Sequence, residues 1–195
     1  STLPRGVRRS STDLGTSMDA MPLTIDTPSP DVRDLLTHEE AQARAAAVSA
    51  VRYELAVEFA ANASTFRGAI GVEFTLAAGA AATAAARGVF LCFRGRTIHA
   101  MRLNGVAIGA PDWNGYRLVL PAAGLKFGAT NRLEVEYENA YDAGGDGVFR
   151  FIDPEDKGEY VYTNFEPYES HRMAPLFDQP DIKGRLSLRV LAPAD

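Results

Sequence analysis

The sequence has 195 residues, 46% of them hydrophobic and 23% charged, which is the composition of an ordinary globular domain. Its net charge of -5 excludes the basic surface that binding to nucleic acid or to an anionic membrane requires. No apolar run is long enough to span a bilayer, and a single cysteine, Cys92, excludes an intrachain disulfide framework.

Residues 1–35 are predicted to form a disordered leader, or in part a segment added before a natural start at Met18 or Met21. The stretch is rich in Ser, Thr, Pro and Gly and contains basic residues, but it lacks the continuous apolar region of a signal peptide. We therefore expect a cytoplasmic protein whose folded domain spans residues 36–195.

A helix is predicted from Thr37 to about Val48. Thr37 is a suitable N-cap, and Glu40 three residues later completes a capping box. Glu39 and Glu40 also suit the positive end of the helix dipole, and the alanines that follow favour continuation of the helix.

From Ser49 onward the hydrophobic period changes from that of a helix to that of a strand. In residues 51–59, for example, Leu55 and Val57 alternate with polar or small residues, which predicts a strand with one buried face. Residues 88–95 are apolar on both faces, which predicts a fully buried strand with Cys92 as a buried thiol. The predicted strands, about eight in number, are residues 51–59, 66–76, 88–95, 97–105, 116–121, 131–141, 159–166 and 184–192.

Two segments interrupt this pattern. Residues 77–88 are rich in alanine and predict either a helical turn or a loose connector. Residues 141–159 are predicted to be a glycine-rich loop followed by a turn at Asp153-Pro154. The sequence thus predicts a mainly β fold, a saddle-shaped antiparallel β-sandwich with one short N-terminal helix.

No complete catalytic motif is visible in the sequence. The three histidines, His38, His99 and His171, are far apart, and the chain has no H-E-x-x-H zinc motif, no G-x-S-x-G elbow and no phosphate-binding loop. From the residues alone we expect no metal ligands and no catalytic residues in this chain.

A dense group of polar and aromatic residues follows the strand 159–166. Because residues two apart in a strand share a face, Tyr160, Tyr162, Asn164 and Glu166 are expected on one face, while the face that includes Phe165 serves the core. The exposed set would suit a polar ligand, because a carboxylate at a strand end can hold an ammonium group. The alternative interpretation is that Glu166 caps the turn that follows.

The next residues have a clearer structural interpretation. Asp178 can accept backbone N–H groups in a turn, and Pro180 fixes φ. Arg172 is placed to pair with Asp178 or with Glu169. We therefore predict that Arg172, Asp178 and Pro180 are scaffold residues.

Residues 160–193, "YVYTNFEPYESHRMAPLFDQPDIKGRLSLRVLAP", closely resemble the N-terminal domain of zinc aminopeptidases of the aminopeptidase N family, relatives of leukotriene hydrolase. Residues 36–59, 99–105 and 146–163 also look like this family, so that the resemblance covers nearly all of the predicted folded part. The resemblance implies a saddle-shaped β domain that packs on a zinc-containing catalytic domain, whose motifs are absent from this chain.

The resemblance also implies roles for two residues. Glu166 matches the carboxylate that helps bind the free α-amino group of the peptide substrate, and Asn164 matches a Gln that lines the first substrate pocket. Asn164 is one methylene shorter than Gln, which puts the side-chain preference of that pocket in question. The implied partners are the catalytic zinc domain and the peptide N-terminus, and the chain alone is predicted to be inactive and to hold no zinc.

A second hypothesis is a stand-alone β-sandwich module that binds a protein or a glycan through exposed aromatic residues. Tyr160, Tyr162 and Tyr168 are the candidates, together with Trp113 in the turn "PDWNGY". A lone Trp in a turn is more often a packing residue.

Overall fold

The computed structural model describes residues 22–25, 33–82, 84 and 88–194. It is mainly β, with one regular helix and three short 3-10 turns among these residues. The elements are β1 (Leu23–Thr24), α1 (His38–Ala47), β2 (Val48–Glu58), β3 (Thr65–Leu76), η1 (Ala78–Ala80), β4 (Val89–Cys92), β5 (Thr97–Leu103), β6 (Val106–Ala107), β7 (Asp112–Trp113), β8 (Arg117–Leu120), η2 (Ala122–Gly124), β9 (Thr130–Ala140), β10 (Gly147–Ile152), β11 (Glu159–Asn164), η3 (Ser170–Arg172) and β12 (Gly184–Leu191).

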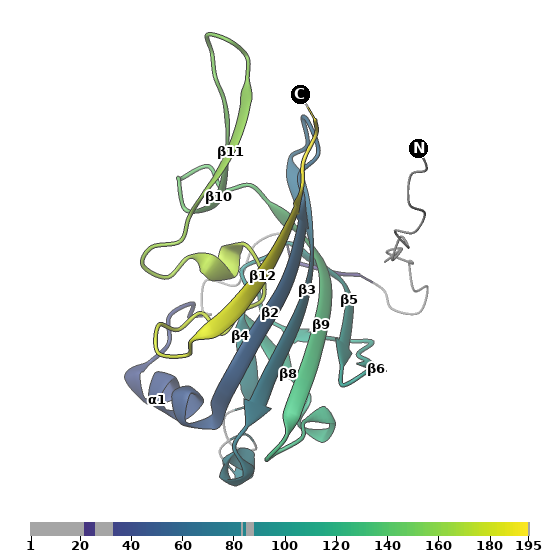
Figure 1. Ribbon diagram of the computed structural model, residues 1–195, viewed down its shortest axis with the longest axis vertical. Coiled ribbons are helices and arrows are strands. Elements are labelled where there is room, and N and C mark those ends of the chain that lie inside the picture. The colour runs from purple at the N-terminus through teal and green to yellow at the C-terminus, as the bar shows by residue number, and fades with distance from the viewer. Residues whose placement is uncertain (1–21, 26–32, 83, 85–87, 195) are drawn as a thin grey trace, which may run out of the picture.

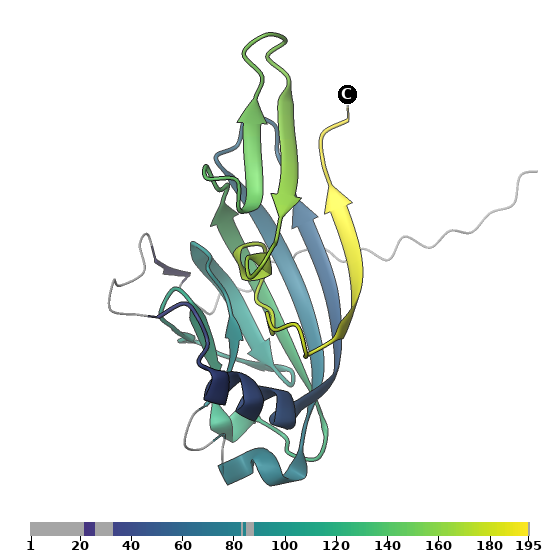
Figure 2. The same ribbon diagram turned by 90° about the vertical axis from the view of Figure 1, so that its left-hand side faces the viewer.

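The largest sheet has seven strands in the order β1-β5-β9-β3-β2-β12, with β6 attached to β5 (Figure 1). Its ladders are antiparallel except for β12, which runs parallel to β2 and so departs from the predicted all-antiparallel sheet. A three-stranded sheet, β4-β8-β7, covers part of one face (Figure 2). The two layers confirm the predicted sandwich.

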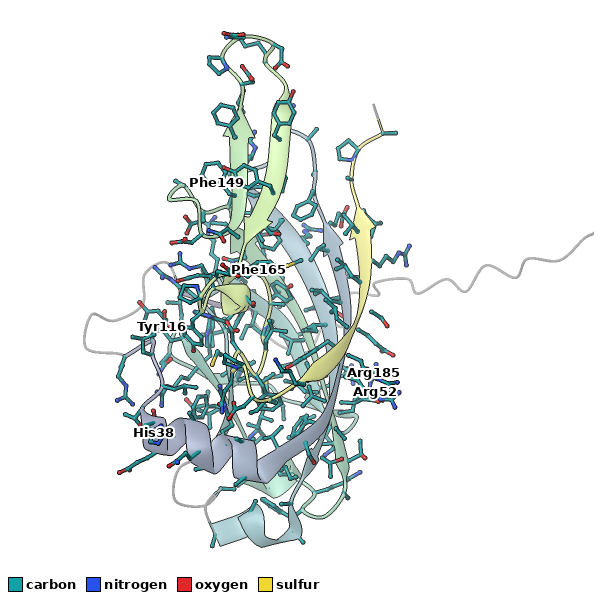
Figure 3. The ribbon with its side chains drawn as sticks, turned by 60° about the vertical axis from the view of Figure 1, so that its left-hand side comes forward. His38, Arg52, Tyr116, Phe149, Phe165 and Arg185 are labelled. Atoms are coloured by element: carbon teal, nitrogen blue, oxygen red, sulfur yellow. The ribbon has the colours of Figure 1, made fainter. Side chains whose placement is uncertain are left out.

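The hydrophobic core lies between these layers. On β3, the residues Phe66, Ile70 and Phe74 share the buried face, as their alternation predicts. All four residues of β4 are buried, so the doubly apolar strand is confirmed and Cys92 is 1% exposed. The outer face of the large sheet is charged, and Arg52 and Arg185 project from adjacent strands there (Figure 3).

Helix α1 begins as predicted. The Thr37 side chain accepts a hydrogen bond from the Glu40 amide, and the Glu40 carboxylate accepts one from the Thr37 amide. Glu40 also pairs with Arg117 of β8, at 2.8 Å, which ties the helix to the small sheet and holds the pKa of Glu40 down to about 2. The alanine-rich segment begins with the short turn η1.

Two segments differ from prediction. Residues 141–159 include the strand β10, which forms a two-stranded hairpin with β11 rather than a loop. The hairpin extends beyond the sandwich (Figures 1 and 2), so neither face of β11 serves the core: Val161 is 37% and Tyr162 50% exposed. Within the predicted leader, Leu23–Thr24 forms β1 on the edge of the large sheet.

The edge strand β12 lies outside the covered part of the sheet. Its residues Leu186, Leu188 and Val190 are paired with core-facing residues of β2, of which Leu55 and Val57 are at most 5% exposed. The three β12 side chains are nevertheless 57%, 52% and 53% exposed. The core face of the sheet therefore continues one strand beyond the described layer that covers it.

Gly68 provides a direct test of the core packing. A Cβ at this position would lie 2.0 Å from Cζ of the buried Tyr137 ring, so Gly68→Ala should lower the free energy of unfolding by about 1–3 kcal/mol through overpacking. Urea unfolding measures the change, with Gly109→Ala as the control because that position has open space around it. Equal midpoints for the two variants would contradict this packing.

Candidate functional site

Asn164 and Glu166 lie where the hairpin returns to the sandwich. Asn164 ends β11, paired with Gly147, and Glu166 lies in the turn that follows, two residues beyond the end of the strand. Both residues are exposed, whereas Phe165 between them is half-buried and packs against the core. Figure 3 shows Phe165 next to the short turn η3, with Phe149 of β10 farther along the hairpin.

The Glu166 carboxylate has no hydrogen bond or ion pair with any residue that the structure describes. The turn is closed instead by its backbone, where the Glu169 amide donates to the Phe165 carbonyl at 3.1 Å. The interpretation of Glu166 as a cap of this turn therefore has no contact to support it. An exposed carboxylate without a partner can accept hydrogen bonds from a ligand.

Tyr168 anchors the turn to buried residues of the core. Its hydroxyl donates to Sγ of Cys92 at 3.0 Å, and its ring lies against the imidazole of His171, with 4.5 Å between ring centroids. Burial, followed by the neighbouring Cys92, raises the pKa of the Tyr168 hydroxyl, so the hydroxyl remains a donor at neutral pH. The predicted buried thiol of Cys92 is thus also a hydrogen-bond acceptor.

The Arg172 side chain makes its ion pairs within the fold. Its guanidinium pairs with Glu169, one of the two predicted partners, and with Asp142 at 2.5 Å. The other predicted partner, Asp178, pairs with a different residue, because its carboxylate faces the neighbouring His171. Arg172 therefore holds the turn against the segment that leads into β10.

His171 is fully buried between two carboxylates. Its Nδ1 lies 2.9 Å from Oδ2 of Asp178, and its Nε2 lies 3.2 Å from Oδ1 of Asp34. The Asp178 carboxylate also accepts the His171 amide at 3.0 Å, as predicted for a turn aspartate. Sequence reasoning missed both histidine contacts, and the contact with Asp34 joins residues too distant in the chain to leave a local signal.

The surroundings of His171 favour the imidazolium. Burial lowers the pKa of the imidazole, but the contacts with Asp178 and Asp34, together with the charges of these carboxylates, outweigh burial and raise it from 6.5 to about 9. Nδ1 shares a hydrogen bond with Asp178, whereas Nε2 lies within ion-pair distance of Asp34 without hydrogen-bond geometry. These contacts favour the cationic form of the ring at neutral pH.

A second buried cation, Arg44 of α1, lies beside this pair. Its guanidinium donates to Gln179 Oε1 at 2.8 Å and to Cys92 Sγ at 3.2 Å. The Gln179 amide in turn donates to the Ala41 carbonyl at 2.8 Å. The segment around Pro180, predicted as scaffold, is thus tied to the helix.

The described residues contain no group of three or more His, Cys, Asp or Glu side chains that could hold a metal ion. His38 and His99 are exposed, and His171 is occupied by its two carboxylates. These residues do not fit a zinc centre. No helix among the described residues is long and apolar enough to cross a membrane.

The comparisons with known proteins identify the family. Residues 49–195 match the model of the peptidase M1 N-terminal domain. The chain belongs to this family. It is 34% identical over 161 residues to aminopeptidase N of Streptomyces lividans, a match that covers 81% of this chain and 18% of that protein. The resemblance seen in residues 160–193 is thereby confirmed.

Solved structures show the same fold. The M1 zinc metallopeptidase of Deinococcus radiodurans aligns with a TM-score of 0.53 and 18% identity, covering 76% of this chain and 33% of that one. Yeast LTA4 hydrolase aligns with a TM-score of 0.61 and 13% identity, covering 86% of this chain and 26% of that one. The chain therefore spans about a fifth to a third of the length of these relatives.

The charge on His171 predicts how stability depends on pH. Because folding raises the pKa of this histidine, its contribution is fully present below pH 6.5 and is lost as the pH rises through about 9. The loss amounts to about 3 kcal/mol in the free energy of unfolding. Urea unfolding between pH 6 and pH 9.5 measures it, and Asp34→Asn should flatten the profile. A wild-type profile as flat as that of the variant would refute the assignment.

Proposed function

We propose that this domain supplies the substrate-recognition edge of a zinc-dependent aminopeptidase that removes N-terminal residues from peptides. The observation that carries the proposal is Glu166, an exposed carboxylate without a described partner, on a turn that is otherwise held firmly to the core. Membership of the M1 N-terminal domain family supports it. The proposed location is the cytoplasm, which agrees with a buried free thiol at Cys92.

The proposed chemistry is recognition of one ammonium group. An exopeptidase must select a free α-amino group over an internal peptide bond, and a carboxylate does so through a charge-assisted hydrogen bond. In the proposal Glu166 binds this group, and Asn164 lines the pocket for the first side chain. In the proposal, the zinc and the residues that activate water lie in a catalytic domain, as the family membership suggests.

The proposed partner is that catalytic domain, and its docking surface is the uncovered apolar face of β12. Leu186, Leu188 and Val190 continue the core face of the sheet, and the neighbouring hairpin adds the half-exposed Tyr160 and Tyr162. Exposed apolar groups that extend a core are typical of a surface that another domain covers. Relatives described as two-domain M1 zinc metallopeptidases support this assignment.

Substitution of Glu166 tests the proposed role. In a chimera where this chain replaces the matching segment of the Streptomyces lividans enzyme, Glu166→Gln should raise KM for an aminoacyl arylamide about 10- to 100-fold with little change in kcat. The reason is that an ammonium loses a charge-assisted hydrogen bond of about 1.5–3 kcal/mol. Glu155→Gln, at the exposed tip of the hairpin, is the control.

An unchanged KM for Glu166→Gln would contradict the assignment of Glu166 to substrate binding. A chimera that folds and binds zinc but has no activity would contradict the broader proposal. In that case the stand-alone binding module becomes the better hypothesis, with the exposed Tyr160 and Tyr162 as its contact residues. Trp113 is not one of them, because it is 6% exposed and donates from Nε1 to the Phe93 carbonyl at 2.9 Å.

The docking surface predicts that the isolated chain associates weakly with itself. Light scattering at increasing concentration should show a growing mass for the wild type and for Ser187→Lys, whose side chain lies on the charged face of β12. Leu188→Lys should remain monomeric, because it places a charge on the apolar face. A wild type that stays monomeric at high concentration would contradict the prediction.

A further inference from the structure

We propose that His171 is a positioning residue, whose imidazolium, held between Asp34 and Asp178, fixes the turn that presents Glu166. This inference rests on the proposed role of Glu166 in substrate binding. It concerns how that carboxylate is held in place, and it assigns a function to a buried ion cluster that includes neither Glu166 nor Asn164.

The charged groups of the cluster are buried or half-buried, so the charge of each has to be compensated by the other members. The imidazole is fully buried. Nε2 of His171 and Oδ1 of Asp34 lie 3.2 Å apart, and both are buried atoms that make no hydrogen bond with any described residue, so the charge of each group is compensated by the other. Removal of either group leaves a polar atom without a partner in the interior, which costs more than an exposed pair would. Asp178 holds the opposite nitrogen and also the backbone amide of His171.

The cluster connects to the turn through Tyr168. Its ring packs on the imidazole, and its hydroxyl donates to Cys92 on β4, so the side chain is held at both ends. Tyr168 is two residues from Glu166, and the hydrogen bond from the Glu169 amide to the Phe165 carbonyl closes the same turn. The carbonyl of His171 accepts the Arg94 amide at 3.0 Å, which ties the end of the turn to the segment after β4.

Two other charged groups lie around the cluster, one in the segment after β4 and one in α1. Arg94 lies 4.0 Å from Oδ2 of Asp34, and Arg44 of α1 donates to the carbonyl of Asp178 at 3.5 Å. Asp34 itself precedes α1, 137 positions before His171 in the chain. The cluster therefore joins the start of the described domain, the small sheet and the turn at one point, and the titratable groups that face the imidazole are the two carboxylates and Tyr168.

Two measurements on this chain alone test the positioning. At pH 7 the 15N NMR signals of His171 should show both ring nitrogens protonated. Amide hydrogen exchange, normalised for intrinsic rates, should show that Asp34→Asn lowers the protection of residues 165–178 at least tenfold relative to the amides of β3 and β9. His99→Gln, which removes an exposed histidine, should leave the protection unchanged.

A neutral imidazole at pH 7, or unchanged protection in Asp34→Asn, would overturn the proposal. If the variant does not fold, the protonation state of His171 in the wild type, measured by NMR, decides whether the proposal stands. In the chimera, Asp34→Asn should raise KM at least threefold with kcat within twofold of the wild type. If Glu166→Gln raises KM and Asp34→Asn does not, the positioning role fails and the proposed function stands. If neither changes KM, the proposed function of Glu166 fails, and the positioning role fails with it.

Discussion

We propose that the candidate site depends on one interaction, that of the buried His171 imidazole with two carboxylates. A charge in the interior is tolerated only when its partners are complete, and removal of one partner of such a pair typically costs about 3–5 kcal/mol. Here the partners come from distant parts of the chain, Asp34 before the helix and Asp178 after the turn. The same cluster thus joins separate elements close to the turn that carries the exposed Glu166.

The second constraint is the incomplete cover of the large sheet. The core-facing side chains of β2, β3 and β9 are buried, but the edge strand β12, which pairs with β2, keeps its apolar side chains exposed. The hairpin β10-β11 extends beyond the same sandwich (Figure 2). The proposed function explains both features in the same way. In the proposal, a catalytic domain covers this surface, which lies next to the turn that carries Glu166.

Much of the fold follows from local sequence rules. The capping box at Thr37 and Glu40 placed the start of the helix, and strict alternation in β2, β3 and β9 placed the strands, because one face of each is buried. The strand β10 was missed because the glycines around Gly145 indicated a loop. A hairpin outside the core has no one-sided burial, so the pairing of β10 with β11 left no clear alternation in the sequence.

The candidate site was only partly predictable for a similar reason. The pairing of Arg172 with Glu169 spans three residues and follows from spacing alone. The contact between His171 and Asp34 depends on the tertiary fold, and no local pattern marks Asp34 in what was predicted to be a leader. The roles of Glu166 and Asn164 come from the family resemblance, because the spacing of the residues alone slightly favours a structural role for Glu166 as a cap of the turn.

The central claim is that Glu166 recognises the α-amino group of a peptide. A thermodynamic cycle tests this proposal. It measures the binding free energies of two inhibitors, one with and one without a free α-amino group, to the chimera with Glu166 and to the chimera with Gln at this position. We expect a coupling energy of about 1.5–3 kcal/mol between the carboxylate and the amino group. A coupling energy of zero, with both inhibitors weakened equally or not at all, would contradict it.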